Sequence, residues 1–347
     1  MSGAVRLILA VTVVLTGGAE AVRGDLFGAY ALRGAFDLPA VSPFDVLADG
    51  RLVTLAGADV YTETGLGTRS FSFAGRLAGM DVPPYAAAFV RVSPDGSRLA
   101  VGNNGGASYA NFKVGVFDTG TLAGGWFPAP HYEAEWFDGT RLGLTAGDFG
   151  QPSRVTMLDV TSNPGSPVNT TVVRNIGGAA SGVTFDRSGR LYTGNGYAGQ
   201  GPSGTGWIKA FEATAWQAAL GGGPAVDFEG AGTLVADVLS AGSLGFDVEG
   251  NLHVGGGDFL GGIDVDYAGL VRHTAVAHAL GGGGPAGTGD IRRFDPDSGN
   301  PANFYDVTYN AITGELYVRE NARVWVYDVP EPAAAITCAL VVFLRRR

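Results

Sequence analysis

One pattern recurs along this chain and constrains its fold more than any other feature. In Val183–Gly194, apolar and polar residues alternate on both sides of an Asp-Arg-Ser-Gly turn. This is the period of two half-buried strands joined as a hairpin. Five further stretches repeat the pattern, each with a turn glycine followed shortly by a leucine. They are Phe44–Leu52, Val90–Leu99, Trp136–Leu142, Phe246–Leu252 and Tyr309–Leu316.

The spacing of these hairpins predicts an all-β repeat fold. The turn glycines follow one another at steps of 46, 43, 50, 61 and 64 residues. A period of about 40 to 50 residues with several short strands per unit is typical of a β-propeller. Six units are visible, and the longer steps leave room for a degenerate seventh around Val226–Val238. We therefore predict a β-propeller of six or seven blades over residues 22–329, with a β-sandwich as the alternative.

Three segments outside the hairpins have predicted structures of their own. The strand-like Leu26–Phe36 is expected to pair with the last unit, because a closed ring protects its terminal edges. Phe211–Leu220 is predicted to form a short helix before a run of three glycines. Leu270–Leu280 is predicted to form a second helix, and both helices are expected in long surface connections.

Composition excludes several classes of function. The net charge of -10 argues against nucleic-acid binding, which needs clustered Lys and Arg. The single cysteine, Cys338, lies near the C-terminus, so the predicted propeller has no disulfide, thiolate metal site or cysteine nucleophile. The 57 glycines suit many tight turns between short strands.

The N-terminus has the layout of a secretory signal peptide. Residues 1–21 contain a basic residue at Arg6, an apolar run over Leu7–Leu15 and the small-x-small triplet Ala19-Glu20-Ala21. We predict cleavage after Ala21, with an uncleaved N-terminal anchor as the alternative. The chain is therefore expected to be exported.

The C-terminus carries a three-part tail over residues 330–347. Val329-Pro330-Glu331-Pro332 precedes the apolar run Ala333–Leu344, and the chain ends in Arg345-Arg346-Arg347. This order resembles the PEP-CTERM sorting tail of exported Gram-negative bacterial proteins. The resemblance implies recognition by an exosortase-like processing enzyme, transient membrane contact through the tail, and residence in the cell envelope, at the cell surface or in the extracellular matrix. The apolar run has 12 residues, fewer than the roughly 20 of a bilayer span.

The body of the chain resembles the bacterial β-propellers of the NHL, SMP-30 and WD40-like kind, on its repeat pattern. Carboxylate, amide and aromatic side chains recur just after the second strand of each predicted unit. If the blades are radial, these loops crowd one face, where they would bind sugar hydroxyls or a divalent cation such as calcium. In the alternative interpretation, they cap strand ends and fill the space between blades. The set comprises Asp59, Asn103, Asn104, Asp148, Phe149, Asn195, Tyr197, Asp258, Phe259, Glu320 and Asn321.

The common hydrolase signatures are missing from the sequence. It has no Gly-x-Ser-x-Gly elbow and no His-Glu-x-x-His pair, and His253 is expected to be a structural strand residue. We therefore assign no catalytic residue and expect a binding or scaffold module for polysaccharide or a surface protein. The alternative is a propeller-type lyase or hydrolase, which requires at least two acidic side chains, or one with His, converging in the axial mouth.

Overall fold

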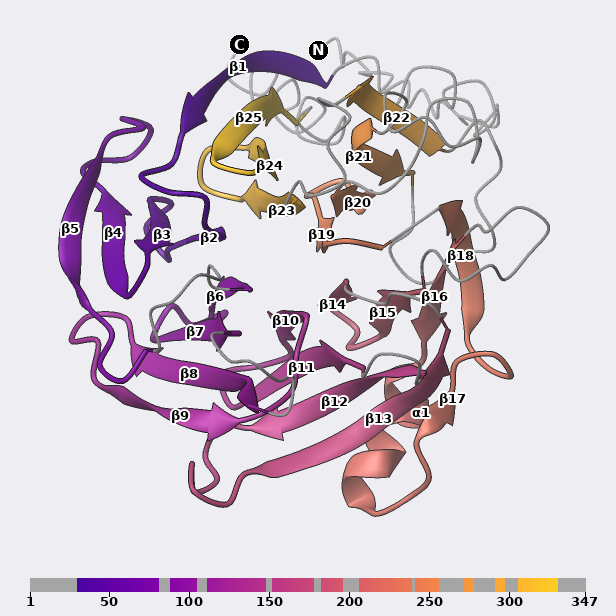
Figure 1. Ribbon diagram of the computed structural model, residues 1–347. Coiled ribbons are helices and arrows are strands. Elements are labelled where there is room, and N and C mark those ends of the chain that lie inside the picture. The colour runs from indigo at the N-terminus through magenta and orange to yellow at the C-terminus, as the bar shows by residue number, and fades with distance from the viewer. Residues whose placement is uncertain are drawn as a thin grey trace, which may run out of the picture.

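The chain forms a closed β-propeller of six blades around a central axis (Figure 1). The computed structural model describes residues 30–80, 88–104, 111–147, 152–177, 182–195, 206–238, 241–255, 271–277, 291–296 and 305–329. The predicted signal peptide and sorting tail lie outside these residues, except for Val329, and remain predictions. Within the described ranges, no helix has the length and apolar character to cross a membrane.

Each blade is built on four antiparallel strands, and the strand that opens its hairpin lies nearest the axis. Blade 1 contains β2 (Phe44–Val46), β3 (Leu52–Ala56), β4 (Asp59–Glu63) and β5 (Phe71–Arg76). Blade 2 contains β6 (Val90–Val92), β7 (Arg98–Asn103), β8 (Lys113–Asp118) and β9 (Gly124–Pro128). Blade 3 contains β10 (Glu133–Trp136), β11 (Arg141–Ala146), β12 (Ser153–Asp159), β13 (Val168–Ile176) and the added strand β17 (Val226–Asp227).

The second half of the ring follows the same order. Blade 4 contains β14 (Val183–Phe185), β15 (Leu191–Gly194), β16 (Gly206–Phe211) and β18 (Thr233–Val238). Blade 5 contains β19 (Leu244–Phe246), β20 (Leu252–Gly255), β21 (Val271–Val276) and β22 (Ile291–Pro296). Blade 6 contains β23 (Tyr305–Asn310), β24 (Glu315–Glu320), β25 (Arg323–Asp328) and the N-terminal strand β1 (Ala31–Asp37).

The predicted hairpins are the two inner strands of the six blades. The repeated leucine of each hairpin is at most 1% exposed, because it packs in the core between blades. Burial of one such side chain stabilises the fold by about 1.5 to 3 kcal/mol. Five of the turn glycines adopt positive φ angles of 70 to 83°, a conformation that favours glycine. These five are Gly50, Gly96, Gly189, Gly250 and Gly314.

The ring closes through the N-terminal strand, as the sequence predicts. β1 pairs antiparallel with β25, from Ala31 opposite Asp328 to Asp37 opposite Arg323, and Figure 1 shows it as the outermost strand of blade 6. Just before β1, the Tyr30 hydroxyl donates a hydrogen bond to Asp247 of blade 5. The N-terminal strand therefore joins the last blade while Tyr30 ties it to its neighbour.

The proposed seventh blade is wrong. Val226–Asp227 adds a parallel strand to blade 3 beside β13, and Thr233–Val238 is the outer strand of blade 4. The extra length of this unit instead holds the predicted helix, which is confirmed as α1 (Ala213–Gln217) and the 3-10 helix η3 (Ala218–Gly221). Trp216 of this insert is fully buried, with its ring 4.9 Å from that of Phe137 in blade 3.

The predicted helix at Leu270–Leu280 is also wrong where the structure describes it. Val271–Val276 is the strand β21, which pairs with β20 on one side and β22 on the other. Thr274, Ala275 and Val276 are fully buried in this sheet. Two neighbouring strands supply the backbone hydrogen bonds here, and this tertiary pairing outweighs a local preference for helix.

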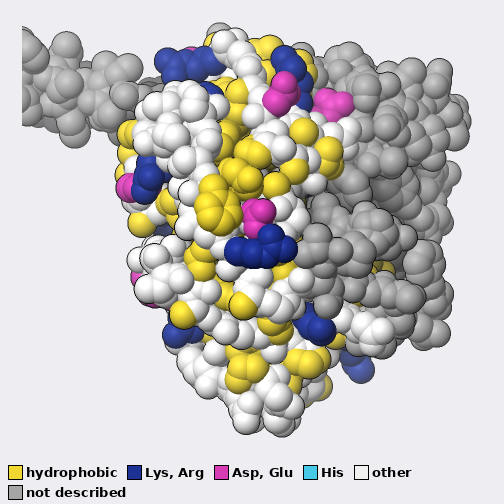
Figure 2. Space-filling view, turned by 60° about the vertical axis from the view of Figure 1, so that its left-hand side comes forward, with side chains coloured by type: hydrophobic (Ala, Val, Ile, Leu, Met, Phe, Trp, Pro, Cys, Tyr) yellow, Lys and Arg dark blue, Asp and Glu magenta, His cyan; other side chains and the backbone are white. Residues whose placement is uncertain are grey.

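The outer wall of the ring is chemically mixed. Figure 2 shows hydrophobic, basic and acidic side chains interspersed on the side that carries blade 1. The exposed apolar residues include Leu66 and Phe73 of this blade, which are 50% and 60% exposed. Basic residues are therefore not clustered on this side of the ring.

Candidate functional site

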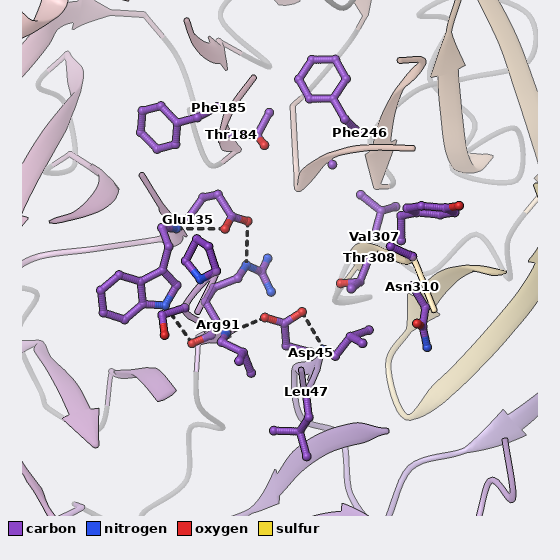
Figure 3. A pocket seen from close by; sticks show the side chains of 18 of the residues that line it. Asp45, Leu47, Arg91, Glu135, Thr184, Phe185, Phe246, Val307, Thr308 and Asn310 are labelled. Atoms are coloured by element: carbon purple, nitrogen blue, oxygen red, sulfur yellow. Dashed lines mark hydrogen bonds and ion pairs between the residues drawn. The ribbon is translucent and has the colours of Figure 1, made fainter. Parts of the chain in front are cut away.

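The innermost strands of all six blades line one cavity on the axis. Its volume is about 500 Å³, and it opens at the end of the ring formed by the hairpin turns. Each strand contributes the residue just before the one that pairs with the repeated leucine. Figure 3 shows Asp45, Arg91 and Glu135 converging, with Thr184 and Thr308 across from them. The full ring comprises Asp45, Arg91, Glu135, Thr184, Gly245 and Thr308.

Arg91 is the buried cation at the centre of this arrangement. Its Nε donates to the carbonyl of Ala134 at 3.0 Å, and Nη1 donates to the carbonyl of Val90 at 2.8 Å and to Asp306 at 3.3 Å. Nη2 donates to Glu133 at 3.0 Å and to Asp306 at 2.9 Å. A guanidinium has five N–H groups. Protein acceptors therefore engage all of them.

Four carboxyl groups surround Arg91. Asp306 and Glu133 contact the guanidinium directly, and Glu135 Oε2 lies 3.7 Å from its Nε. Asp45 accepts the backbone N–H groups of Val46 and Val92 at 2.8 and 2.6 Å. One further buried cation, Arg319 of β24, interacts electrostatically with Asp306 and Glu133. Four carboxyls against two guanidiniums leave an excess of two acidic groups.

Burial shifts the titration of these carboxyls toward neutral pH. Burial raises the pKa of Asp45 to about 6 and the pKa of Glu135 to about 7, although Arg91 opposes both shifts. Burial also raises the pKa of Glu133. Burial lowers the pKa of Arg91, but the carboxylates of Asp306 and Glu133 outweigh this and raise it overall. Perturbed carboxyls that converge in a cavity are typical of functional sites.

Aromatic rings and free hydroxyl groups complete the cavity wall. Trp136, Phe185, Phe246 and Tyr309 line it together with the two threonines. Thr184 is 5% exposed, and its hydroxyl forms no hydrogen bond with any described residue. A smaller hollow of about 190 Å³ shares three of the aromatic residues with the cavity and extends over the turns of blades 4 and 5.

The residues predicted from the sequence lie elsewhere. The described members follow the second strand of their blades, and the end of that strand is opposite the hairpin turns in an antiparallel sheet. Asp59 pairs with Arg76 at 2.7 Å, and the side chain of the buried Asn195 accepts the backbone N–H of Trp207. None of the described members lines the axial cavity. Those members are Asp59, Asn103, Asn104, Asn195, Glu320 and Asn321.

The remaining predicted residues, Asp148, Phe149, Tyr197, Asp258 and Phe259, lie outside the described residues. Ligand binding by this set therefore stays a prediction. The enzymatic alternative stays a prediction as well, because Glu133 and Asp306, which converge on one nitrogen of Arg91, are buried beside the cavity and do not line it. Sequence reasoning missed the axial residues, because Arg91 and Thr308 precede their leucines by eight residues and the other four precede theirs by seven, so the repeats do not align on the leucines without a gap.

Metal ligands and histidines add little to the described part of the cavity. The described ranges contain no group of three His, Cys, Asp or Glu side chains placed to hold a metal ion. The predicted calcium site stays a prediction for the rest of the chain. His253 is fully buried, and its Nε2 lies 3.0 Å from Asp247, which is the structural position expected for it.

Comparison with known proteins identifies the fold and not a family. No protein-family model matches the chain, and no curated protein shows significant similarity to it. The PQQ domain of pyranose dehydrogenase from Coprinopsis cinerea has a TM-score of 0.54 at 11% identity, over 86% of this chain and 97% of that one. The gluconolactonase XC5397 from Xanthomonas campestris has a TM-score of 0.51 at 12% identity, over 85% and 88%.

A chain of the mitotic checkpoint complex has a TM-score of 0.51 at 13% identity, over 94% of this chain and 99% of that one. Enzymes and a member of a protein assembly thus share this architecture with the chain. A propeller hosts many unrelated functions, so function has to be argued from the axial cavity.

Proposed function

We propose that this protein is an exported β-propeller that binds a polyhydroxylated ligand, such as a sugar unit of a polysaccharide, in its axial cavity. The observation that carries the proposal is the cavity itself, which is lined by the carboxyl groups of Asp45 and Glu135 together with the hydroxyl groups of Thr184 and Thr308. The export signal and the sorting-type tail support residence at the cell surface or in the extracellular matrix, with an exosortase-like enzyme as the processing partner.

The chemistry of the cavity suits a sugar. Its volume of about 500 Å³ lies within the range of small-ligand sites. Phe185, Phe246 and Tyr309 contribute apolar lining to the cavity and to the adjoining hollow, and apolar surface suits the C–H groups of a sugar. Asp45 and Glu135 can accept hydrogen bonds from ligand hydroxyls, while Thr184 and Thr308 can donate or accept them.

Conservative substitutions in the cavity are expected to weaken glycan binding. Glu135→Gln should raise the Kd by about tenfold to a hundredfold, because a hydrogen bond to a charged group contributes about 1.5 to 3 kcal/mol. Thr184→Val, which removes a hydroxyl at nearly constant volume, should raise it by about threefold to tenfold. A glycan array followed by isothermal titration calorimetry on the bound glycans measures both effects.

Glu212→Gln is the matched control, because Glu212 precedes α1 in the outer insert, its side chain is 64% exposed, and it does not line the cavity. This variant should bind like the wild type. Weaker binding by Glu320→Gln with unchanged binding by Glu135→Gln would move the ligand to the loops predicted from the sequence.

A second candidate function is a hydrolase or lyase that uses the same cavity. It is favoured by two carboxyls, Asp45 and Glu135, whose pKa values are raised to about 6 and about 7 by burial. Such groups can exchange protons near neutral pH, as general acids and bases do. Products of any bound glycan should then form with a rate that Glu135→Gln lowers by at least about a hundredfold. Complete recovery of intact glycan after prolonged incubation would exclude this function for that ligand.

A further inference from the structure

We propose that the axial cavity selects a ligand with a positively charged amine, so that it binds an amino sugar in preference to a neutral one. The inference deepens the proposed function and rests on it. It assigns the class of sugar from the charges and hydrogen-bond acceptors that the six inner strands place on the axis.

The cavity presents carboxyl acceptors without a charged donor. Arg91 gives all five of its N–H groups to protein acceptors, so none remains for an anionic ligand. Each carboxylate oxygen of Asp45 accepts a single backbone N–H, and Glu135 Oε1 accepts that of Trp136. A carboxylate has about four acceptor sites, so both groups keep acceptor capacity for a ligand. In Figure 3 both carboxyl groups lie toward the centre of the cavity.

A second, independent feature points to a ligand with polar groups. Thr184 is 5% exposed, its hydroxyl forms no hydrogen bond with any described residue, and it lines the same cavity. A hydroxylated ligand would satisfy it.

The charged groups that line this site or contact Arg91 come from four strands. They are Asp45 of β2, Arg91 of β6, Glu133 and Glu135 of β10, and Asp306 of β23, with Arg319 of β24 adjoining Asp306 and Glu133. Two carboxyls exceed the cations, and a ligand ammonium would supply part of the missing positive charge. A bound cation favours the ionised carboxyls, and it therefore lowers their pKa values.

This coupling fixes the sign of the pH dependence. Burial raises the pKa of Asp45 and Glu135 to about 6 and about 7 in the free protein, so both are largely protonated at pH 5. Binding of a protonated amine must then displace protons, so affinity rises with pH from about 5 until the ligand amine itself begins to lose its proton. A neutral sugar carries no charge that would lower these pKa values, so its affinity should not rise with pH in this way.

The test compares two ligands that differ at the nitrogen. The β-1,4-linked tetramer of glucosamine and the fully N-acetylated tetramer are titrated into the full chain by isothermal titration calorimetry at pH 5, 6 and 7. At pH 6, where most of the glucosamine amines are still protonated, the glucosamine tetramer should bind at least about tenfold more tightly than the acetylated tetramer. At pH 6, the binding enthalpy should differ between two buffers of different ionisation enthalpy, in the direction that indicates release of protons on binding. Glu135→Gln should reduce the preference to within about threefold, whereas Glu212→Gln should preserve it.

Equal binding of the two tetramers would overturn the inference and leave the proposed sugar site standing. The inference would also be overturned if glucosamine did not bind while an uncharged glycan bound the wild type and lost affinity in Glu135→Gln. A glucosamine preference that Glu135→Gln does not change would place the cation site outside the cavity and contradict the proposal. Calcium chloride alone is titrated in parallel, and calcium binding that blocks glucosamine would identify a metal site instead.

Discussion

Replacement of Arg91 by methionine is expected to lower the free energy of unfolding by about 3 to 5 kcal/mol. The substitution removes the cation while Asp306, Glu133 and Glu135 remain around its place. Breaking a buried ion pair costs more than the pair contributed, because the remaining charges stay in a region of low dielectric. The melting temperature should fall by roughly 10 °C.

Chemical denaturation of the wild type and the variant at pH 7.5 measures the effect. Arg76→Met is the control, because the Arg76 side chain is 62% exposed and pairs with Asp59 at the surface. That variant should lose less than about 1 kcal/mol. The cost of Arg91→Met should shrink at pH 5, where protonation of the raised-pKa carboxyls removes their charge. Similar losses in the two variants would show that the axial charges are not coupled as the distances indicate.

Removal of the N-terminal strand is expected to abolish cooperative folding. A chain that begins at Leu38 lacks β1, so the edge of β25 loses its backbone partners from Asp328 to Arg323. It also loses Phe36, which packs on the buried core between blades 6 and 1. A domain is stable by about 5 to 15 kcal/mol, and opening the ring should remove most of that. The exposed edge is also expected to promote aggregation.

A chain that begins at Tyr30 is the reference, and both are compared by thermal unfolding and size-exclusion chromatography. Arg33→Ala and Arg323→Ala serve as controls. Arg33→Ala removes the ion pairs of β1 with Glu315 and Asp328, and Arg323→Ala removes the ion pair of β25 with Asp37 of β1. Both variants keep the strand. Because both arginines are more than half exposed, each variant should lose less than about 1 kcal/mol. A monomeric, cooperatively unfolding chain without β1 would show that the ring does not depend on closure.

The blades were predictable because every unit has to bury the same hairpin between its neighbours. That requirement repeats a leucine in strict alternation, and five turn glycines with positive φ mark the hairpins. The segment Val271–Val276 was not predictable in this way. Its local sequence is compatible with a helix, and its conformation is set by β20 and β22, which come from other parts of the chain.

The axial site was missed for a related reason. Asp45, Arg91 and Glu135 occupy polar positions of the alternation, and such positions usually face solvent. Radial packing turns them toward the axis instead, where Arg91 meets Asp306 across 215 residues of sequence. No local pattern encodes a contact of that range. The ligand site was predicted in the loops after the second strands because Asp and Asn are concentrated there. These residue types also cap strand ends, so their presence does not by itself mark a binding site.

The pairing of β1 with β25 also decides how the molecule responds to a mechanical force. Ala31, the first residue of β1, lies opposite Asp328, the last residue of β25. Tension applied through Tyr30 and Val329 would therefore pull both strands from the same end. Their hydrogen bonds would break one after another, after the bond between Tyr30 and Asp247. Strands loaded from opposite ends resist by shear, with many bonds carrying the force at once. A pull on the two termini would thus unzip this seam at low force while the other five blades stay intact.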